Sequence, residues 1–181
     1  MKGKLIVVSG PSGAGKSTVT KIARDKLHIP LTISATTRNP RQDETDGKDY
    51  YFLTEEEFMK RVNNDEFFEW AKVHDNYYGT LKSEVEKKRE EGNTVLLEID
   101  VQGGLIVKKK DPSAVLVFFK APDDKELEER LRNRGSDSEE TISKRLENAL
   151  KEMEYERNYD YSIVNINIDQ SYQELSDIIN H

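Results

Sequence analysis

The chain has 181 residues, with 28 Lys and Arg against 35 Asp and Glu, which gives a formal net charge of −7. This length fits one domain, or one domain with inserted lobes, and it can bury a core without covalent cross-links. The absence of Cys excludes a disulfide scaffold, an iron–sulfur cluster, thiolate-bound zinc and a Cys nucleophile. The acidic charge argues against a general nucleic-acid binder, whose affinity comes from neutralising phosphates, but it leaves small anionic ligands open.

The first apolar run covers only residues 5–8. It is too short for the apolar region of a secretory signal. No window of the sequence approaches the length of a membrane span. We therefore expect a cytoplasmic protein with no membrane partner.

Apolar, β-branched runs alternate with helical patterns along the chain. The runs predict strands at 5–8, 31–34, 94–99, 114–119 and 161–166. The helical patterns between and after them predict helices at 16–27, 81–91, 102–110, 123–134, 138–158 and 172–179. Strands that are apolar on both faces and separated by helices predict an α/β fold in three layers, with a central five-stranded parallel sheet.

Two stretches depart from this alternation. Residues 35–80 are polar and aromatic, with one short helix that the capping box Thr54-Glu55-Glu56-Glu57 predicts. Residues 123–150 are almost entirely helical and highly charged. We interpret both as lobes inserted into one domain, with lobes at 34–81 and 123–147 and a core made of 1–33, 82–122 and 148–181.

The segment after the first predicted strand matches the pattern G-x-x-x-x-G-K-[ST]. Its residues are Gly10, Pro11, Ser12, Gly13, Ala14, Gly15, Lys16 and Ser17. It follows a strand and opens a helix, which is the context that the motif requires. The glycines let backbone N–H groups point at phosphate oxygens, Lys16 reaches the β- and γ-phosphates, and the Ser17 hydroxyl can ligate Mg²⁺. The pattern predicts a nucleoside triphosphate with Mg²⁺ as the first ligand.

A second group of anion-binding side chains lies outside this loop. Arg38 and Arg41 follow a predicted strand, and Tyr50, Tyr77 and Tyr78 lie in the same lobe. Guanidinium forks and phenolic hydroxyls suit a phosphate that carries two negative charges. The Asn-Lys-x-Asp segment expected of a GTPase does not occur in the sequence.

At this point the chain resembles the guanylate kinases, which transfer a phosphoryl group from ATP to GMP. The similar segments include SGPSGAGKST at 9–18, SATTRNPR at 34–41, FEWAKVHDNYYGT at 68–80, LLEIDVQG at 96–103 and RLRNRG at 130–135. The resemblance implies a P-loop NTPase core, a GMP-binding lobe at 34–81 and a helical lid at 123–147. At residues 42–43, Gln-Asp stands where the family pattern has Pro-Gly, and we expect this to alter the turn after Arg41.

The resemblance also implies a set of residues for the GMP site. These are Ser34 and Glu69 for guanine, Arg38, Arg41, Tyr50 and Tyr78 for the phosphate, and Thr80 and Asp100 to complete the acceptor site. The Glu69 carboxylate can accept hydrogen bonds from both N1–H and N2–H₂ of guanine, whereas adenine would present a lone pair at N1. The neighbours Phe67 and Phe68 indicate a partly buried Glu69, and we expect Trp70 in the core.

The resemblance further implies that five cations neutralise charge on the transferring phosphoryl group: Lys16, Arg38, Arg130, Arg134 and Arg145. The ATP-binding loop extends to Thr18, and the family pattern puts Asn165 near the donor adenine. Asp100 at a strand end is expected to order Mg²⁺ through water. Glu98 and Glu44 are further acidic candidates in the same neighbourhood.

The expected reaction is direct transfer of the γ-phosphoryl of Mg·ATP to a phosphate oxygen of GMP, giving ADP and GDP. No general base is needed because the second pKa of a phosphate monoester is about 6. We expect dGMP to be accepted too and no obligate protein partner. Two alternatives remain. One is a non-catalytic interaction module, which the intact phosphate loop disfavours. The other is a kinase for another nucleotide or a P-loop NTPase of different use; Ser34 and Glu69 favour guanine over these.

Overall fold

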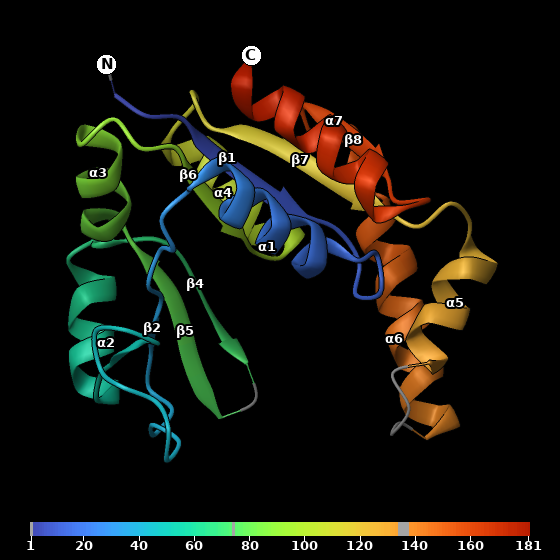
Figure 1. Cartoon of the computed structure of the whole chain (residues 1–181). Helices are drawn as coiled ribbons and strands as arrows, with labels where there is room; N and C mark the ends of the chain where they lie inside the picture. Colours follow the sequence, from blue (N-terminus) through green and yellow to red (C-terminus); the bar gives the residue numbers. More distant parts are fainter. Residues whose placement is uncertain (1, 74, 134–137) are drawn as a thin grey trace.

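The computed structural model describes residues 2–73, 75–133 and 138–181 (Figure 1). Its core is a parallel sheet of four strands in the order β6-β1-β7-β8. The strands are β1 (Leu5–Ser9), β6 (Val95–Glu98), β7 (Val115–Lys120) and β8 (Tyr161–Val164). The covering helices are α1 (Lys16–Leu27), α3 (Lys82–Glu90), α4 (Val101–Lys110) and α7 (Ile168–Asn180). The prediction of an α/β fold with a parallel sheet is confirmed.

Strand β1 is buried on both faces, as its continuous apolar run predicts. Ile6 and Val8 pack in the cluster that α1 and α7 complete. Leu5 and Val7 pack in the opposite cluster with residues of α3 and α4. The alternation along the strand therefore divides the core into two apolar layers, with helices on both sides of the sheet (Figure 1).

The prediction of five strands is wrong. Residues 31–34 form no strand, and Leu31 is 59% exposed. The Ile33 backbone N–H donates to the Glu84 side chain at 3.4 Å rather than to a neighbouring strand. At this point the chain leaves the core and meets another backbone only at its end, where the Tyr51 N–H donates to the Ser34 carbonyl at 2.9 Å. A short apolar run does not become a strand without a partner backbone along its length.

A second, mixed sheet follows, with strands in the order β3-β2-β5-β4. Its elements are β2 (Ala35–Thr36), β3 (Tyr51–Phe52), β4 (Phe67–Val73), β5 (Asn76–Leu81) and the helix α2 (Glu55–Asn63). Phe58 of α2 packs with Ala35, Phe67 and Leu81 in a core of its own. The predicted capping box is confirmed, because the Thr54 hydroxyl accepts from the Glu57 N–H and the Glu57 carboxylate accepts from the Thr54 N–H.

A β-bulge between Phe67 and Glu69 interrupts the pairing of β4 with β5. It leaves three consecutive residues, Phe67 to Glu69, buried where a regular strand would alternate. Glu69 is thus more buried than expected. The prediction of Trp70 in the core is wrong: its side chain lies edge-on to Phe58 and the residue is 39% exposed.

The turn after Arg41 forms without the Pro-Gly of the family pattern. The Glu44 N–H donates to the Arg41 carbonyl at 3.1 Å and closes the turn over residues 42–43. Neither residue has a positive φ, so the turn does not need glycine.

Helices α5 (Asp124–Arg132) and α6 (Glu139–Met153) form a helical pair beside the core. Leu127 and Leu131 of α5 pack with Ala149 of α6. The predicted helix 138–158 is shorter in the structure: α6 ends at Met153, and the 3₁₀ turn η1 (Glu156–Asn158) follows. This pair and the second sheet extend from opposite ends of the core (Figure 1). Within the described ranges, no helix is long and apolar enough to span a membrane.

Candidate functional site

The loop of residues 10–15 joins β1 to α1, as predicted. Gly10 has φ +139° and Gly15 has φ +83°, a conformation that L side chains rarely adopt. A Cβ on Gly10 would lie 2.0 Å from the Phe119 carbonyl oxygen, and one on Gly15 would lie 2.2 Å from Asn165 Nδ2. Backbone shape and close packing both require glycine at these two positions.

A pocket of about 400 Å³ lies over this loop. Its lining comprises Gly10, Ser12, Gly13, Gly15, Lys16, Ser17, Thr18, Glu98, Ile99, Asp100 and Glu152. Lys16 Nζ donates to the carbonyls of Gly10 at 2.6 Å and Pro11 at 2.9 Å. Backbone N–H groups at a helix N-terminus and a lysine ammonium favour an anion. Of the described loop residues, Pro11 and Ala14 stay outside the lining.

Two carboxylates stand on the pocket wall at the end of β6. Glu98 accepts from the Ser17 hydroxyl at 2.5 Å and from the Thr20 hydroxyl at 2.8 Å. Asp100 caps the N-terminus of α4, where its side chain accepts from the Gly103 N–H at 3.0 Å. From the sequence, Glu98 is only one of several acidic candidates for this neighbourhood. In the structure its carboxylate accepts from the Ser17 hydroxyl.

A second pocket of about 360 Å³ adjoins the first. Its lining comprises Arg24, Leu31, Thr32, Ser34, Glu44, Asp49, Tyr50, Thr80, Leu96, Leu97, Glu98 and Ile99. Glu98 and Ile99 line both pockets. The structure thus brings three predicted acceptor residues, Ser34, Tyr50 and Thr80, to a cavity that shares a wall with the phosphate loop.

Glu69 does not line this pocket; it is 8% exposed and is bonded to Thr80, which does. The Thr80 hydroxyl donates to its Oε1 at 2.7 Å. Burial raises the pKa of the Glu69 carboxyl, and the negative charge of Asp100 raises it further, against the opposing hydrogen bonds from Thr80. Burial therefore deprives the Glu69 carboxylate of hydration, and hydrogen bonds from the N–H groups of a ligand would compensate for the lost water.

Arg38 is held in place by Glu44. The guanidinium Nη2 donates to Glu44 Oε1 at 2.8 Å, and the guanidinium carbon Cζ lies 5.5 Å from the ring centre of Tyr50. The Tyr50 and Tyr78 rings meet edge to face at 6.3 Å. The hydrogen bond from Arg38, with a second from the Arg41 N–H, lowers the pKa of Glu44 to about 2. Glu44 therefore orients the Arg38 guanidinium and fixes the backbone at Arg41 in the predicted phosphate site.

A third pocket of about 470 Å³ lies on the other side of the loop. Gly15, Thr18, Arg130, Asn165 and the exposed Ile166 and Ile168 contribute to its lining. The Asn165 side chain is 95% removed from solvent and bonded at both polar atoms, to the Ala14 carbonyl and to the Ser171 hydroxyl.

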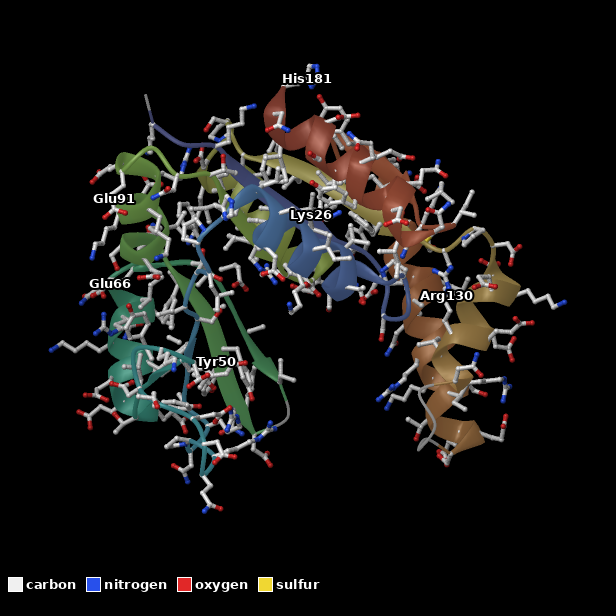
Figure 2. All side chains as sticks on the ribbon, viewed as in Figure 1. Lys26, Tyr50, Glu66, Glu91, Arg130 and His181 are labelled. Carbon is white, nitrogen blue, oxygen red and sulfur yellow. The ribbon has the colours of Figure 1, made fainter. Side chains whose placement is uncertain are left out.

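The three predicted lid arginines have different positions. Arg130 donates to Glu126 at 2.7 Å and to the Asn165 carbonyl at 2.9 Å. Arg145 lines a pocket of about 300 Å³ together with Ser12 of the phosphate loop. Arg134 lies outside the described residues. Figure 2 shows Arg130 on the helical pair and Tyr50 on the second sheet, on opposite sides of the molecule.

Glu152 is a pocket residue that sequence reasoning missed. It lines both the phosphate-loop pocket and the pocket of Arg145. Burial raises the pKa of its carboxyl, against the charge of Lys16. Its spacing of seven from Arg145 puts both on one face of α6, which was the available signal.

Comparisons with known proteins agree on one family. A family model described as guanylate kinase matches residues 2–181. A guanylate kinase of Fusobacterium nucleatum subsp. nucleatum is 59% identical over 177 residues, 98% of this chain and 96% of the relative. One of Thermotoga maritima is 46% identical over 180 residues, 99% of this chain and 87% of the relative. The crystal structure of guanylate kinase from Anaplasma phagocytophilum matches with a TM-score of 0.74 at 32% identity, covering 99% of this chain and 85% of that one.

Proposed function

This chain belongs to the guanylate kinase family and is an ATP:GMP phosphotransferase, and on that premise we propose where each substrate binds. The observation that carries the proposal is the shared wall of two pockets at Glu98 and Ile99. One pocket lies on the phosphate loop, and the other is lined by Ser34, Tyr50 and Thr80. A donor in the first and an acceptor in the second would meet at the end of β6.

The ATP phosphates bind over the loop of residues 10–18. Lys16 exchanges the carbonyls of Gly10 and Pro11 for β- and γ-phosphate oxygens, which are stronger partners for an ammonium. The adenine lies in the third pocket, where Ile166 and Ile168 offer apolar surface beside Asn165.

The residues at the end of β6 fit Mg²⁺. The Ser17 hydroxyl and the carboxylates of Glu98 and Asp100 are oxygen donors on the wall of the donor pocket. Among the described residues, no group of three acidic or His side chains could hold a metal alone, which suits an ion bound mostly through nucleotide phosphates. When bound, Mg²⁺ neutralises charge on the β- and γ-phosphates. Ser17 would ligate it directly and Asp100 through water, with Glu98 fixing the Ser17 hydroxyl.

GMP binds in the second pocket and extends to Glu69, which is bonded to the pocket residue Thr80. Its phosphate contacts Arg38, Arg41, Tyr50 and Tyr78. Glu44 holds the Arg38 guanidinium and the Arg41 backbone N–H in advance, and the rings of Tyr50 and Tyr78 pack against each other. Its guanine base contacts Ser34, Thr80 and Glu69. The ionised Glu69 accepts from both guanine N–H groups, and Ser34 donates to the guanine carbonyl oxygen.

The γ-phosphoryl group is transferred in line, with the attacking and leaving oxygens on opposite sides of the phosphorus. A GMP phosphate oxygen, already anionic near pH 7, forms a bond to the γ-phosphorus while the bond to the bridging oxygen of ADP breaks. The groups that neutralise the moving charge are Lys16, Arg38, Arg130, Arg134 and Arg145. The lobes at 34–81 and 123–147 close over the nucleotides and exclude water, which would otherwise hydrolyse ATP. Use of dGMP, a cytoplasmic location and the lack of an obligate protein partner stay predictions.

The first experiment measures ADP release from Mg·ATP by the purified chain with GMP, AMP, CMP, UMP or no acceptor. We expect fast turnover with GMP alone, and a loss of at least about 10³-fold in kcat for Lys16→Ala with an unchanged circular dichroism spectrum. Lys21→Ala, at an exposed lysine on the same helix, is the matched control and keeps wild-type turnover. Retained turnover in Lys16→Ala would contradict the proposed mechanism.

A further inference from the structure

We infer that Asn165 is a positioning residue that sets the conformation of the phosphate loop through its side-chain amide. Asn165 follows β8, and its Nδ2 donates to the carbonyl of Ala14 within the loop at 2.8 Å. The residue is 5% exposed, so water does not compete freely for this bond. The inference rests on the proposed donor site and adds a role for Asn165 apart from contact with the adenine.

The orientation of this amide follows from its two partners. The Ala14 carbonyl only accepts, so the NH₂ of Asn165 must face it. The amide oxygen then faces Ser171 and accepts from its hydroxyl at 2.8 Å, and Ser171 is fully buried on α7. Asn165 is also anchored by its backbone, which donates to the Lys120 carbonyl at 2.8 Å and accepts from Arg130 at 2.9 Å. Both side-chain bonds and both backbone bonds hold the amide in one place.

The bond to Ala14 controls the direction of a phosphate-binding group. In a trans peptide the C=O and the N–H of the same plane point in opposite directions. When Asn165 draws the Ala14 carbonyl toward itself, the N–H of Gly15 in that peptide turns the other way. Gly15 lines the phosphate-loop pocket. It is the N-cap of α1, and its backbone has a left-handed conformation there. Asn165 thereby aims one of the loop N–H groups that are proposed to bind phosphate.

The test uses inorganic tripolyphosphate, which carries the phosphates of ATP without a base. Its affinity for the whole chain is measured by calorimetry. Asn165→Asp keeps the size of the side chain and the acceptor for Ser171 but puts a carboxylate against the Ala14 carbonyl. We expect at least about tenfold weaker binding, because two facing acceptors repel each other and the Gly15 N–H then loses its fixed direction. Ser171→Ala, which removes only the second partner, is expected to weaken binding by about threefold.

Asn167→Asp is the matched control for tripolyphosphate, which carries no base, because it makes the same change of charge at another residue that lines the third pocket. Asn167 is the N-cap of α7, where its side chain accepts from the Gln170 N–H, and Asp caps equally well. We expect its affinity for tripolyphosphate to stay within about twofold of wild type, after allowance for a screened surface charge. An equal loss in Asn167→Asp and Asn165→Asp would overturn the inference, since charge alone would then explain both.

A second measurement separates loop positioning from adenine contact. The donors compared are ATP and ITP, which has a carbonyl in place of the adenine amino group. For each of the variants Asn165→Asp and Ser171→Ala, we expect the KM for ATP and the KM for ITP to rise by the same factor. The KM for GMP should stay unchanged. A defect confined to ATP, with unchanged tripolyphosphate affinity, would assign Asn165 to the adenine instead. If Asn165→Asp does not fold, Ser171→Ala decides alone by the same criteria. Failure of the proposed function would show differently, as absent turnover in the wild-type chain.

Discussion

Glu69 shows what a single buried carboxylate contributes and costs. It is 8% exposed, and its pKa is raised because burial disfavours the charged form. Above its folded pKa, the ionised side chain lowers the stability of the free protein. This penalty is relieved as the pH falls through the folded pKa toward the unfolded one. The same carboxylate is the proposed acceptor for both guanine N–H groups.

Glu69→Gln is therefore expected to change stability and GMP binding in opposite directions. The variant keeps an acceptor for the Thr80 hydroxyl but no longer buries a charge near Asp100, so the melting temperature at pH 7 should rise, by about 2–4 °C for each kcal/mol relieved. An amide NH₂ facing the guanine donors should lower kcat/KM for GMP at least about 100-fold. Differential scanning calorimetry and steady-state kinetics measure the two effects.

Glu129→Gln, at an exposed carboxylate of α5, is the control for this pair of effects and should change neither. The stability gain of Glu69→Gln should also shrink as the pH is lowered, because the wild-type carboxyl then becomes neutral. An unchanged kcat/KM for GMP would contradict the assignment of Glu69 to the guanine.

Helix α2 illustrates how an element is stabilised locally. Its nine residues would be marginal as an isolated helix. The capping box at Thr54 and Glu57 satisfies orphan N–H groups at its start, and the single buried apolar contact of α2, Phe58, attaches it to the second sheet.

Thr54→Ala should lower the free energy of unfolding by about 1 kcal/mol, because the Glu57 N–H loses its side-chain acceptor. Thr54→Ser keeps the hydroxyl and should stay close to wild type. Urea denaturation followed by circular dichroism measures both. Since Thr54 does not line a proposed substrate pocket, kcat at saturating GMP should be unaffected. Equal stability of the Ala and Ser variants would show that the cap contributes nothing.

Among the described residues, four apolar clusters have no member in common, two around the parallel sheet and one in each lobe, and we therefore expect the lobes to move relative to the core. The second sheet packs around Phe58 and Phe67, and the helical pair packs around Leu127 and Leu131. Neither cluster shares residues with the two clusters of the parallel sheet. Bodies with their own cores can move with little repacking.

Hydrogen–deuterium exchange should resolve this motion. GMP alone is expected to slow exchange in β2 to β5 by about tenfold. Slower exchange in α5 and α6 is expected only when a donor nucleotide is present as well. The reason is that closure buries backbone amides and adds contacts only when the substrates are bound. The amides of β1 serve as the internal reference, since they are buried in either state. Equal protection of all elements by GMP alone would contradict two independent lobes.

Several features could be predicted from the sequence because their causes are local. The bounds of α1 at Lys16–Leu27 match the prediction, since the phosphate loop before it and Pro30 after it limit the helix. The capping box at Thr54 also follows from a four-residue pattern. Most residues of the GMP site came from resemblance to a family, and their roles remain proposals.

Other features depend on which segments meet in space. The strand predicted at 31–34 does not form because it meets another backbone only at Ser34, whose carbonyl accepts from the Tyr51 N–H. Trp70 is partly exposed because the bulge in β4 shifts which residues face the core. Glu152 reaches the phosphate-loop pocket from a helix more than 130 residues away, and Asn165 reaches Ala14 across 151 positions. The amino-acid pattern alone is thus enough to predict the local elements and the phosphate loop, because short-range sterics and hydrogen bonds govern them, and its motifs identify the family. Strand partners, burial and the network around the loop could be read only from the folded chain, because they arise from contacts between residues far apart in sequence.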